Sequence, residues 1–337
     1  MKQRNPTIDY IKAIGVIGVM IMHLHTPIRY VAPIITNCYI PLFFICSGYT
    51  TSLDKTINLK RKCSSLMFPY IFYYLLFFIL VLLGVIEPTR HEIIGFLYSR
   101  SEVAGINIQS LSIGPSWFLT AMLSTFVLYK AMSYIKTSIL SKAILTGTLG
   151  MLIAYFCKIN LPWSLENAAM LLSYIYIGQM LRPHIDNQQK PMWIFVPILI
   201  YVFGAIYNGN VGISLSEYGR NIVLCYALPI LAFWILFKIL PPPISILNSS
   251  RMFRLGSYIG KNSLTIFMSH MLFYYMYKYV FDNNVFNGFY IFQEHHFLLQ
   301  GFVVFLTVIS TILTCKWQSL QLENIKAFIS KYGSSDK

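Results

Sequence analysis

Acidic, basic and imidazole side chains bracket the first apolar segment of the chain. Asp9 and Lys12 precede the apolar residues 13–22, and His23 and His25 follow them. In a helix, the step of eleven residues from Lys12 to His23 is about three turns and about 16 Å of rise, so both side chains lie on one face at different depths. Ionisable groups at bilayer depth are costly and usually mark a site, but the pattern also fits a helix with snorkelling ends and one hydrogen-bonded histidine.

Two kinds of chemistry are available to these residues. Histidine is the natural base near neutral pH, so His23 is a candidate for proton transfer. Lys12 offers a positive point charge to a phosphate. Asp9 lies one turn from Lys12, within pairing distance, and either holds Lys12 in place or only neutralises it.

The second apolar segment and the basic run after it form another candidate cluster. The segment is interrupted by residues that weaken a continuous helix: Pro33, Asn37, Pro41, Ser47 and Gly48. Such breaks persist at membrane depth only where protein or a cavity satisfies the backbone. The run Lys60-Arg61-Lys62 follows at the predicted level of Asp9 and Lys12. It either anchors the topology against anionic lipid or joins Lys12 in a cationic basin for a phosphorylated ligand.

The elements that position these residues are predicted to be membrane-spanning helices. The 337 residues are 56% hydrophobic and only 11% charged, a balance that excludes a soluble fold. Helices are required because unpaired backbone groups cannot face lipid. We expect an all-α polytopic membrane protein with about ten spans, near 8–30, 31–53, 66–86, 115–135, 139–157, 163–181, 191–208, 219–240, 260–281 and 297–316.

The distribution of charge predicts the topology. Most of the 26 Lys and Arg residues fall in alternate connections that lie on one side when both termini are cytoplasmic, as the positive-inside rule requires. The same distribution explains the net charge of +14 without a nucleic-acid partner. We expect one transmembrane domain over 1–317 and a short cytoplasmic tail over 318–337. The connections 87–114 and 282–296 lie outside, either as plain loops or as the mouth of a site.

Other sequence features argue against further chemistry. The six cysteines are scattered and read as packing residues. The adjacent His295 and His296 fit a solvated loop better than a metal site. A glycine-rich phosphate loop is absent from the sequence, which argues against an ATP-driven pump. The first segment resembles a signal peptide, but Asp9 and His23 interrupt it and no cleavage site follows, so we expect it to be retained.

Taken together, the motifs resemble those of the bacterial membrane acyltransferase family 3, whose multi-helix members O-acylate cell-surface glycans. The match runs from residue 5 to about 270, and its pieces are in the family's order. They are Asp9, Lys12 and His23; Phe43-Phe44 with Ser47-Gly48; Lys60-Arg61-Lys62 with Pro69; Trp117-Phe118-Leu119; Gly178; and Ser263-Leu264 with His270. Lys12 stands where the family has arginine, which keeps the charge but loses the planar fork for bidentate contacts.

The resemblance implies an O-acyltransferase, most often an O-acetyltransferase, of the bacterial inner membrane. Its donor is cytosolic acyl-coenzyme A, with no bound cofactor or metal, and its acceptor is a cell-envelope polysaccharide or a lipid-linked precursor. His23 and Asp9 become the catalytic residues, with His23 either as base in direct transfer or as acyl carrier. The implied donor-binding residues are Lys12, Ser47, Lys60, Arg61 and Lys62.

Three further residues have two interpretations each. His270 is either a hydrogen-bonded structural histidine or a contact to donor or acceptor. Trp117 is either an anchor in the aromatic belt or a surface on which a sugar stacks. Ser47 is a poor nucleophile candidate, because serine in an apolar helix commonly bonds to the backbone one turn away.

Two rival functions also fit the sequence. A transporter or flippase for a lipid-linked glycan would likewise need about ten helices, broken segments and buried charges. A ligand-sensing membrane subunit fits less of the pattern. The transporter is distinguished by the absence of acyl transfer, since it needs no thioester.

Overall fold

The computed structural model describes residues 5–23, 30–51, 57–85, 92–99, 102–103, 106–107, 114–156, 161–185, 192–240, 251–280, 305–314 and 316. These residues are helical apart from short turns and one antiparallel pair, β1 (Glu102–Val103) and β2 (Ile106–Asn107). The helices are α1 (Pro6–Met22), α2 (Val31–Thr36), α3 (Tyr39–Thr50), α4 (Leu59–Leu82), α5 (Glu92–Tyr98), α6 (Trp117–Met132), α7 (Ile139–Phe156), α8 (Leu165–Ile185), α9 (Phe195–Asn208), α10 (Ile222–Ile239), α12 (Arg251–Lys261) and α13 (Ser263–Val280), with a further helix at Phe305–Thr314.

All ten apolar stretches expected from the sequence contain one of these helices. Four helical stretches within the described residues are long and apolar enough to cross a membrane: Val31–Thr50, which comprises α2 and α3, and Leu59–Leu82, Ile139–Phe156 and Ile222–Ile239. The protein is therefore a helical membrane protein, while the count of ten spans and the cytoplasmic termini stay predictions. Helices α5 and α12 were not expected, because they lie in connections. The tail 318–337, the connection 282–296 and His25 lie outside the described residues.

Local capping explains where two functionally important helices begin. Asn5 accepts a hydrogen bond from the Thr7 amide at 3.0 Å, and Pro6 occupies the first turn of α1. Asn58 accepts from the Arg61 amide at 3.0 Å and starts α4. The basic run is consequently the first turn of α4, several residues before the boundary at 66 that hydropathy indicated.

The interruption expected in the second segment lies between α2 and α3. Asn37, buried at this break, donates its side-chain amide to the Pro33 and Gly209 carbonyls, each at 2.8 Å. The protein thus supplies the partners that the broken backbone and the buried amide need. The break orients α3 independently of α2, and α3 enters the centre of the bundle.

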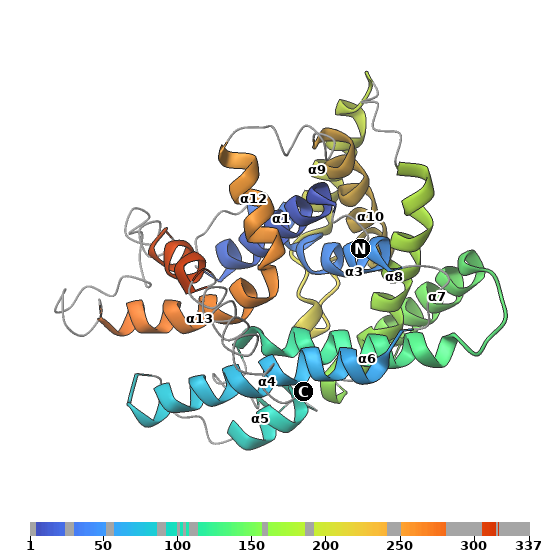
Figure 1. Cartoon of the computed structure of the whole chain (residues 1–337). Coiled ribbons are helices and arrows are strands. Elements are labelled where there is room, and N and C mark those ends of the chain that lie inside the picture. The colour runs from blue at the N-terminus through green and yellow to red at the C-terminus, as the bar shows by residue number, and fades with distance from the viewer. Residues whose placement is uncertain are drawn as a thin grey trace, which may run out of the picture.

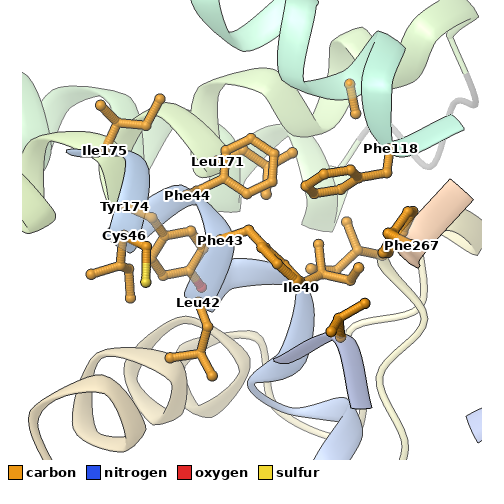
Figure 2. Packing of buried hydrophobic residues seen from close by; sticks show 14 of the residues in the cluster. Ile40, Leu42, Phe43, Phe44, Cys46, Phe118, Leu171, Tyr174, Ile175 and Phe267 are labelled. Carbon is orange, nitrogen blue, oxygen red and sulfur yellow. The ribbon is translucent and has the colours of Figure 1, made fainter. Parts of the chain in front are cut away.

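Helices α3 and α8 meet with their backbones in contact. A Cβ added to Gly48 would lie 1.9 Å from the Ile175 carbonyl oxygen, and one added to Gly178 would lie 2.1 Å from that of Ile45. Only glycine permits this approach at both positions. Around the contact the buried core gathers Phe44, Leu171, Tyr174 and other residues, as Figure 2 shows.

Helix α12 lies against the beginning of α1 (Figure 1). Gly256 of α12 faces the ring of Tyr10, and a Cβ at Gly260 would lie 1.5 Å from the Asp9 carbonyl oxygen. The two glycines are one helical turn apart and form one face of α12. This close packing buries the Asp9 side of α1 under α12, whose outer face exposes Arg251 and Arg254.

The contacts define two ends of the bundle. Lys62 at the start of α4 lies over Phe126, toward the end of α6, whereas the turn just before α6 contacts α13. Helices α6 and α8 run parallel, since Ser124 bonds to the Trp163 carbonyl near the start of α8 and Tyr129, further along α6, bonds to Gln179, further along α8. We call the end with Asp9, Lys12, Cys46 and Lys62 the lysine end, and the end with His23, His270, Trp117 and Glu166 the histidine end.

Candidate active site

The two intramembrane histidines of the sequence meet at the histidine end. His23 follows the last turn of α1 and His270 lies in α13, and their rings are 5.1 Å apart between centroids at an angle of 61°. His270 Nε2 is 3.5 Å from His23 Nδ1. His270 is buried with 2% of its surface exposed, whereas His23 is partly exposed. The pair therefore has one inner ring and one ring that a substrate can reach.

The backbone determines which nitrogens carry hydrogen in the neutral rings. His23 Nδ1 lies 2.8 Å from the Val19 carbonyl oxygen, and His270 Nδ1 lies 2.7 Å from that of Phe267. A carbonyl oxygen only accepts, so both Nδ1 atoms must donate. The lone pairs are then on the two Nε2 atoms, and His270 Nε2 is directed to the N–H of His23. This arrangement orients His23 with its basic nitrogen on the side away from Val19.

A cluster of phenylalanines lies beside the inner histidine. The ring of Phe267 is 6.0 Å from His270 and 4.8 Å from Phe118, and Phe43 is 5.5 Å from Phe118 between centroids. Figure 2 shows Phe43, Phe118 and Phe267 converging from α3, α6 and α13. Trp117 is half-buried and packs edge-on against Phe118. Ring contacts therefore connect Trp117 to His270 through Phe118 and Phe267.

The cationic residues gather at the lysine end, but not all of them face inward. Asp9 is buried and Lys12 half-buried, and the charges of both act on Cys46 of α3. Lys62 is half-buried, with Nζ 4.4 Å from the centroid of the Phe126 ring. A ring face stabilises an ammonium in this position. The positive charge of Lys12 also acts on Lys62. Two adjacent lysine charges repel each other, so the cluster is suited to an anionic ligand.

The remaining residues of the basic run lie on the surface. Lys60 and Arg61 are exposed on the first turn of α4. The run was predicted either to anchor the topology or to join Lys12 in a cationic basin, and Lys62 is the residue of the run on which the charge of Lys12 acts. Lys60 and Arg61 lie at the rim of the same end.

Comparison of the sequence with known families finds one family match. A family model described as an acyltransferase domain covers residues 5–316. The chain belongs to acyltransferase family 3. The search of curated proteins and the search of solved structures each found no match. The family assignment confirms the resemblance drawn from the motifs and supports the transfer of acyl groups as the activity class of this membrane protein.

The glycines of the family's motifs act in this acyltransferase through packing. Ser47 is half-buried, and its carbonyl accepts hydrogen bonds from the Thr50 and Thr51 hydroxyls. Its neighbour Gly48 and the distant Gly178 make the backbone contact between α3 and α8. The contact fixes α3, which packs Phe43 against Phe118 and Phe267 and carries Cys46, on which the charges of Asp9 and Lys12 act, about one turn further along.

A buried polar network at the histidine end was missed from the sequence. Asn167 donates to Glu166 Oε1 at 2.8 Å and accepts from the Tyr218 hydroxyl at 2.7 Å. Asn208 donates to Asn37 Oδ1 at 2.8 Å. Glu166, Asn167, Asn208 and Asn37 are all buried. The sequence feature that could have revealed this network is the presence of amide and carboxylate side chains inside apolar stretches, because such buried groups must find hydrogen-bond partners.

Among the residues that the structure describes, no cluster of side chains is arranged as metal ligands. No group of three or more His, Cys, Asp or Glu side chains there is close enough to hold an ion. The four cysteines of the described ranges, Cys38, Cys46, Cys63 and Cys225, are free thiols. Proton transfer and charge stabilisation by the side chains named above are the chemistry that the site offers.

Proposed function

We propose that the protein is an integral O-acyltransferase of the bacterial inner membrane, with acetyl as the most common acyl group. It moves the acyl group from cytosolic acyl-coenzyme A to a hydroxyl of a cell-envelope polysaccharide or its lipid-linked precursor. Membership of the acyltransferase family supports the reaction class. The observation that carries the proposal is the contact of His23 with His270 at the end of α1 remote from Lys12 and Lys62.

In the first step, the oriented lone pair of His23 accepts a proton. His23 Nε2 takes the proton of the acceptor hydroxyl while the hydroxyl oxygen attacks the thioester carbonyl. The tetrahedral intermediate collapses and expels the thiolate of coenzyme A, which takes the proton back from His23. An ester replaces a thioester, and coenzyme A leaves as the thiol. Direct transfer accounts for the products without an acyl-histidine intermediate.

His270 acts through His23 as a positioning residue. Its Nε2 accepts from the same N–H that His23 donates to the Val19 carbonyl. When His23 becomes an imidazolium, both acceptors bind a charged donor, and such hydrogen bonds are roughly twice as strong as neutral ones. The pair therefore stabilises the protonated base during the reaction.

The lysine end is suited to the phosphates of the donor. Lys12 and Lys62 supply two positive charges near each other, and Lys60 and Arg61 extend the charge to the surface. We assign Ser47 to the same donor region, and Asp9 to the placement of Lys12. The rise of about 16 Å from Lys12 to His23 is comparable with an extended pantetheine arm. A donor bound by its phosphates at one end thus brings its acyl group toward the histidine pair.

The proposal is tested by measuring O-acylation of the surface glycan by mass spectrometry. Three strains are compared: one with the gene, one without it, and one complemented with the His23→Ala protein. We expect the acyl groups to be lost in the last two strains. An unchanged acylation pattern with an altered amount of exported glycan would instead identify a transporter of the lipid-linked glycan.

A further inference from the structure

A polar pocket opens at the histidine end, on the other side of the bundle from α13. It has a volume of about 1060 Å³ and lies between the end of α7 and the connection 209–221. Figure 1 shows α7 and α13 on opposite sides of the bundle. The polar and aromatic residues around it are Tyr155, Asn210, Glu217, Tyr218, Arg220 and Asn221. The predicted topology places this connection on the exterior side.

The connection that forms the pocket is held in one conformation. Gly212 and Glu217 exchange two backbone hydrogen bonds, at 2.9 and 3.0 Å, and close a tight loop. The amides of Arg220 and Asn221 bond to the backbone and side-chain oxygens of Asn208, each at 2.8 Å. The side chains of this loop are thereby presented from a fixed backbone, which lowers the entropic cost of binding.

The buried polar network forms the support beneath the pocket. The Tyr218 hydroxyl is bound to Asn167, which is bound in turn to Glu166. The Asn167 side chain also donates to the Ile213 carbonyl at 3.2 Å. These groups satisfy one another inside the protein, whereas Asn210, Glu217 and Arg220 are exposed at the opening. The polar groups at the opening have no comparable role in holding the fold.

We infer that this pocket binds a saccharide segment of the acceptor, at a distance from the hydroxyl that is acylated. Glu217 accepts hydrogen bonds, Arg220 donates them, and the side-chain amide of Asn210 does both, as a ligand rich in hydroxyls requires. Asn221 contributes only its NH2 group, since its side-chain oxygen accepts from the Val223 and Leu224 amides at the start of α10. The rings of Tyr155 and Tyr218 offer apolar faces for the C–H face of a sugar. A carboxylate in the pocket disfavours the phosphates of the donor, which the lysine end attracts.

The inference rests on the proposed function and extends it to the size of the acceptor. A molecule that contacts both this pocket and the histidine pair spans the width of the bundle. The acceptor is therefore an oligosaccharide or polymer of several sugar units and not a single sugar. The pocket selects the chain, and the histidine pair acts on one hydroxyl within it.

The test uses the full-length protein in nanodiscs and oligosaccharides released by mild acid from the envelope of cells that lack the gene. Binding is measured by calorimetry without acyl donor, and transfer is measured with acetyl-coenzyme A. The variants are Glu217→Gln with Arg220→Gln, and Asn210→Trp, which fills the pocket without changing its charge. The matched control is Lys136→Gln, an exposed charge in the connection between α6 and α7.

We expect both pocket variants to weaken oligosaccharide binding and to raise the acceptor KM about tenfold or more, because each loses polar contacts or space. The kcat at saturating acceptor and the KM for acetyl-coenzyme A should stay as in the wild type. Wild-type acceptor KM and affinity in both variants would overturn the inference while leaving the proposed function standing. A different result would overturn the proposed function and leave the saccharide site standing. In that case the wild-type protein binds the oligosaccharide but transfers no acyl group, and the pocket variants abolish the binding.

Discussion

At the residue scale, the chemistry of the site depends on two imidazole rings that share one N–H. His23 alone, at the end of α1, would be a base with one backbone contact. His270 adds a second acceptor to the same N–H and is itself fixed by the Phe267 carbonyl. We propose on this basis that His23 is the base that contacts the acceptor and that His270 is a buried partner that fixes its tautomer and its orientation.

Replacing either histidine should lower turnover through one shared mechanism. We expect His23→Ala to reduce kcat about a hundredfold or more while the KM for acyl-coenzyme A changes little. His270→Ala should reduce kcat less, about tenfold, because His23 keeps its bond to Val19. The double variant should be no slower than His23→Ala alone, since the second ring acts through the first. Steady-state kinetics on membranes with equal amounts of inserted protein provide the measurement.

Ser269 offers a matched control for the histidine variants. It is buried beside His270, and its hydroxyl has no hydrogen-bond partner in the structure. Ser269→Ala should retain wild-type kcat, since it removes a buried hydroxyl without breaking a hydrogen bond. Near wild-type turnover of a well-inserted His23→Ala protein would show that His23 is a structural residue, and the assignment of the base would be withdrawn.

The lysine end should control donor affinity and not turnover. Lys12→Ala should raise the KM for acyl-coenzyme A about tenfold by removing a charged contact to phosphate. Lys12→Arg should retain or improve donor binding, because the guanidinium keeps the charge and adds the planar fork. Initial rates at varied donor and saturating acceptor give this value. A lower kcat with unchanged donor KM in Lys12→Ala would contradict the assignment, and Lys136→Ala is the control for general loss of surface charge.

At the scale of the elements, close helix contacts hold the two candidate sites in register. Helix α3 is fixed against α8 through Gly48 and Gly178. Helix α1 is fixed against α12 through Gly256 and Gly260. Small residues at helix crossings are a common means of association in membranes, where no hydrophobic force drives helices together.

The contact between α3 and α8 predicts a strong effect of one methyl group. Gly48→Ala places Cβ against the Ile175 carbonyl and should cost about 1–3 kcal/mol or more, because neither backbone can yield. We expect a lower melting temperature of the detergent-solubilised protein and weaker acyl transfer. Gly204→Ala is the control, since its Cβ would meet the flexible end of the Leu228 side chain at 3.0 Å. Equal melting temperatures for the two variants would contradict the packing role of Gly48.

At the scale of the whole molecule, we propose that the lysine and histidine ends carry two separate tasks along one axis. Lys62 lies at one end, and the histidine pair and the pocket beside the connection 209–221 lie at the other. The positive-inside prediction gives this axis its direction, with the lysine end toward the cytosol. A cytosolic donor and an exterior acceptor then approach the histidine pair from opposite sides.

Reporter fusions test the direction of this axis. A reporter after Arg100 should lie outside and a reporter after Lys337 inside, so that the two fusions give opposite signals. The reason is the concentration of lysine and arginine in the connections assigned to the cytosol. If both fusions report the same side, the count of ten spans is wrong, and the assignment of donor and acceptor to opposite faces fails with it.

The sequence by itself determined the features that depend on composition and on local geometry. Its hydropathy predicted a helical membrane protein, and the spacing of Asp9, Lys12 and His23 placed them on one helix, because helical rise and periodicity are local properties. The motif order indicated the family that the family model confirms. Pro33, Asn37, Pro41, Ser47 and Gly48 indicated that the second segment is interrupted, since proline removes a backbone donor wherever it lies. The structure places the break after Thr36, and Pro41, Ser47 and Gly48 lie within α3.

The tertiary structure alone decided which distant residues meet. His23 and His270 are 247 residues apart, and only the packing of α13 beside α1 brings their rings together. The same holds for Gly48 and Gly178, and for Asn167 and Tyr218 beneath the saccharide pocket. No periodicity of one segment encodes its partner, because that choice depends on the shape of every helix packed around it. The local sequence thus identifies the residues that can do chemistry, and the fold brings them together in a site.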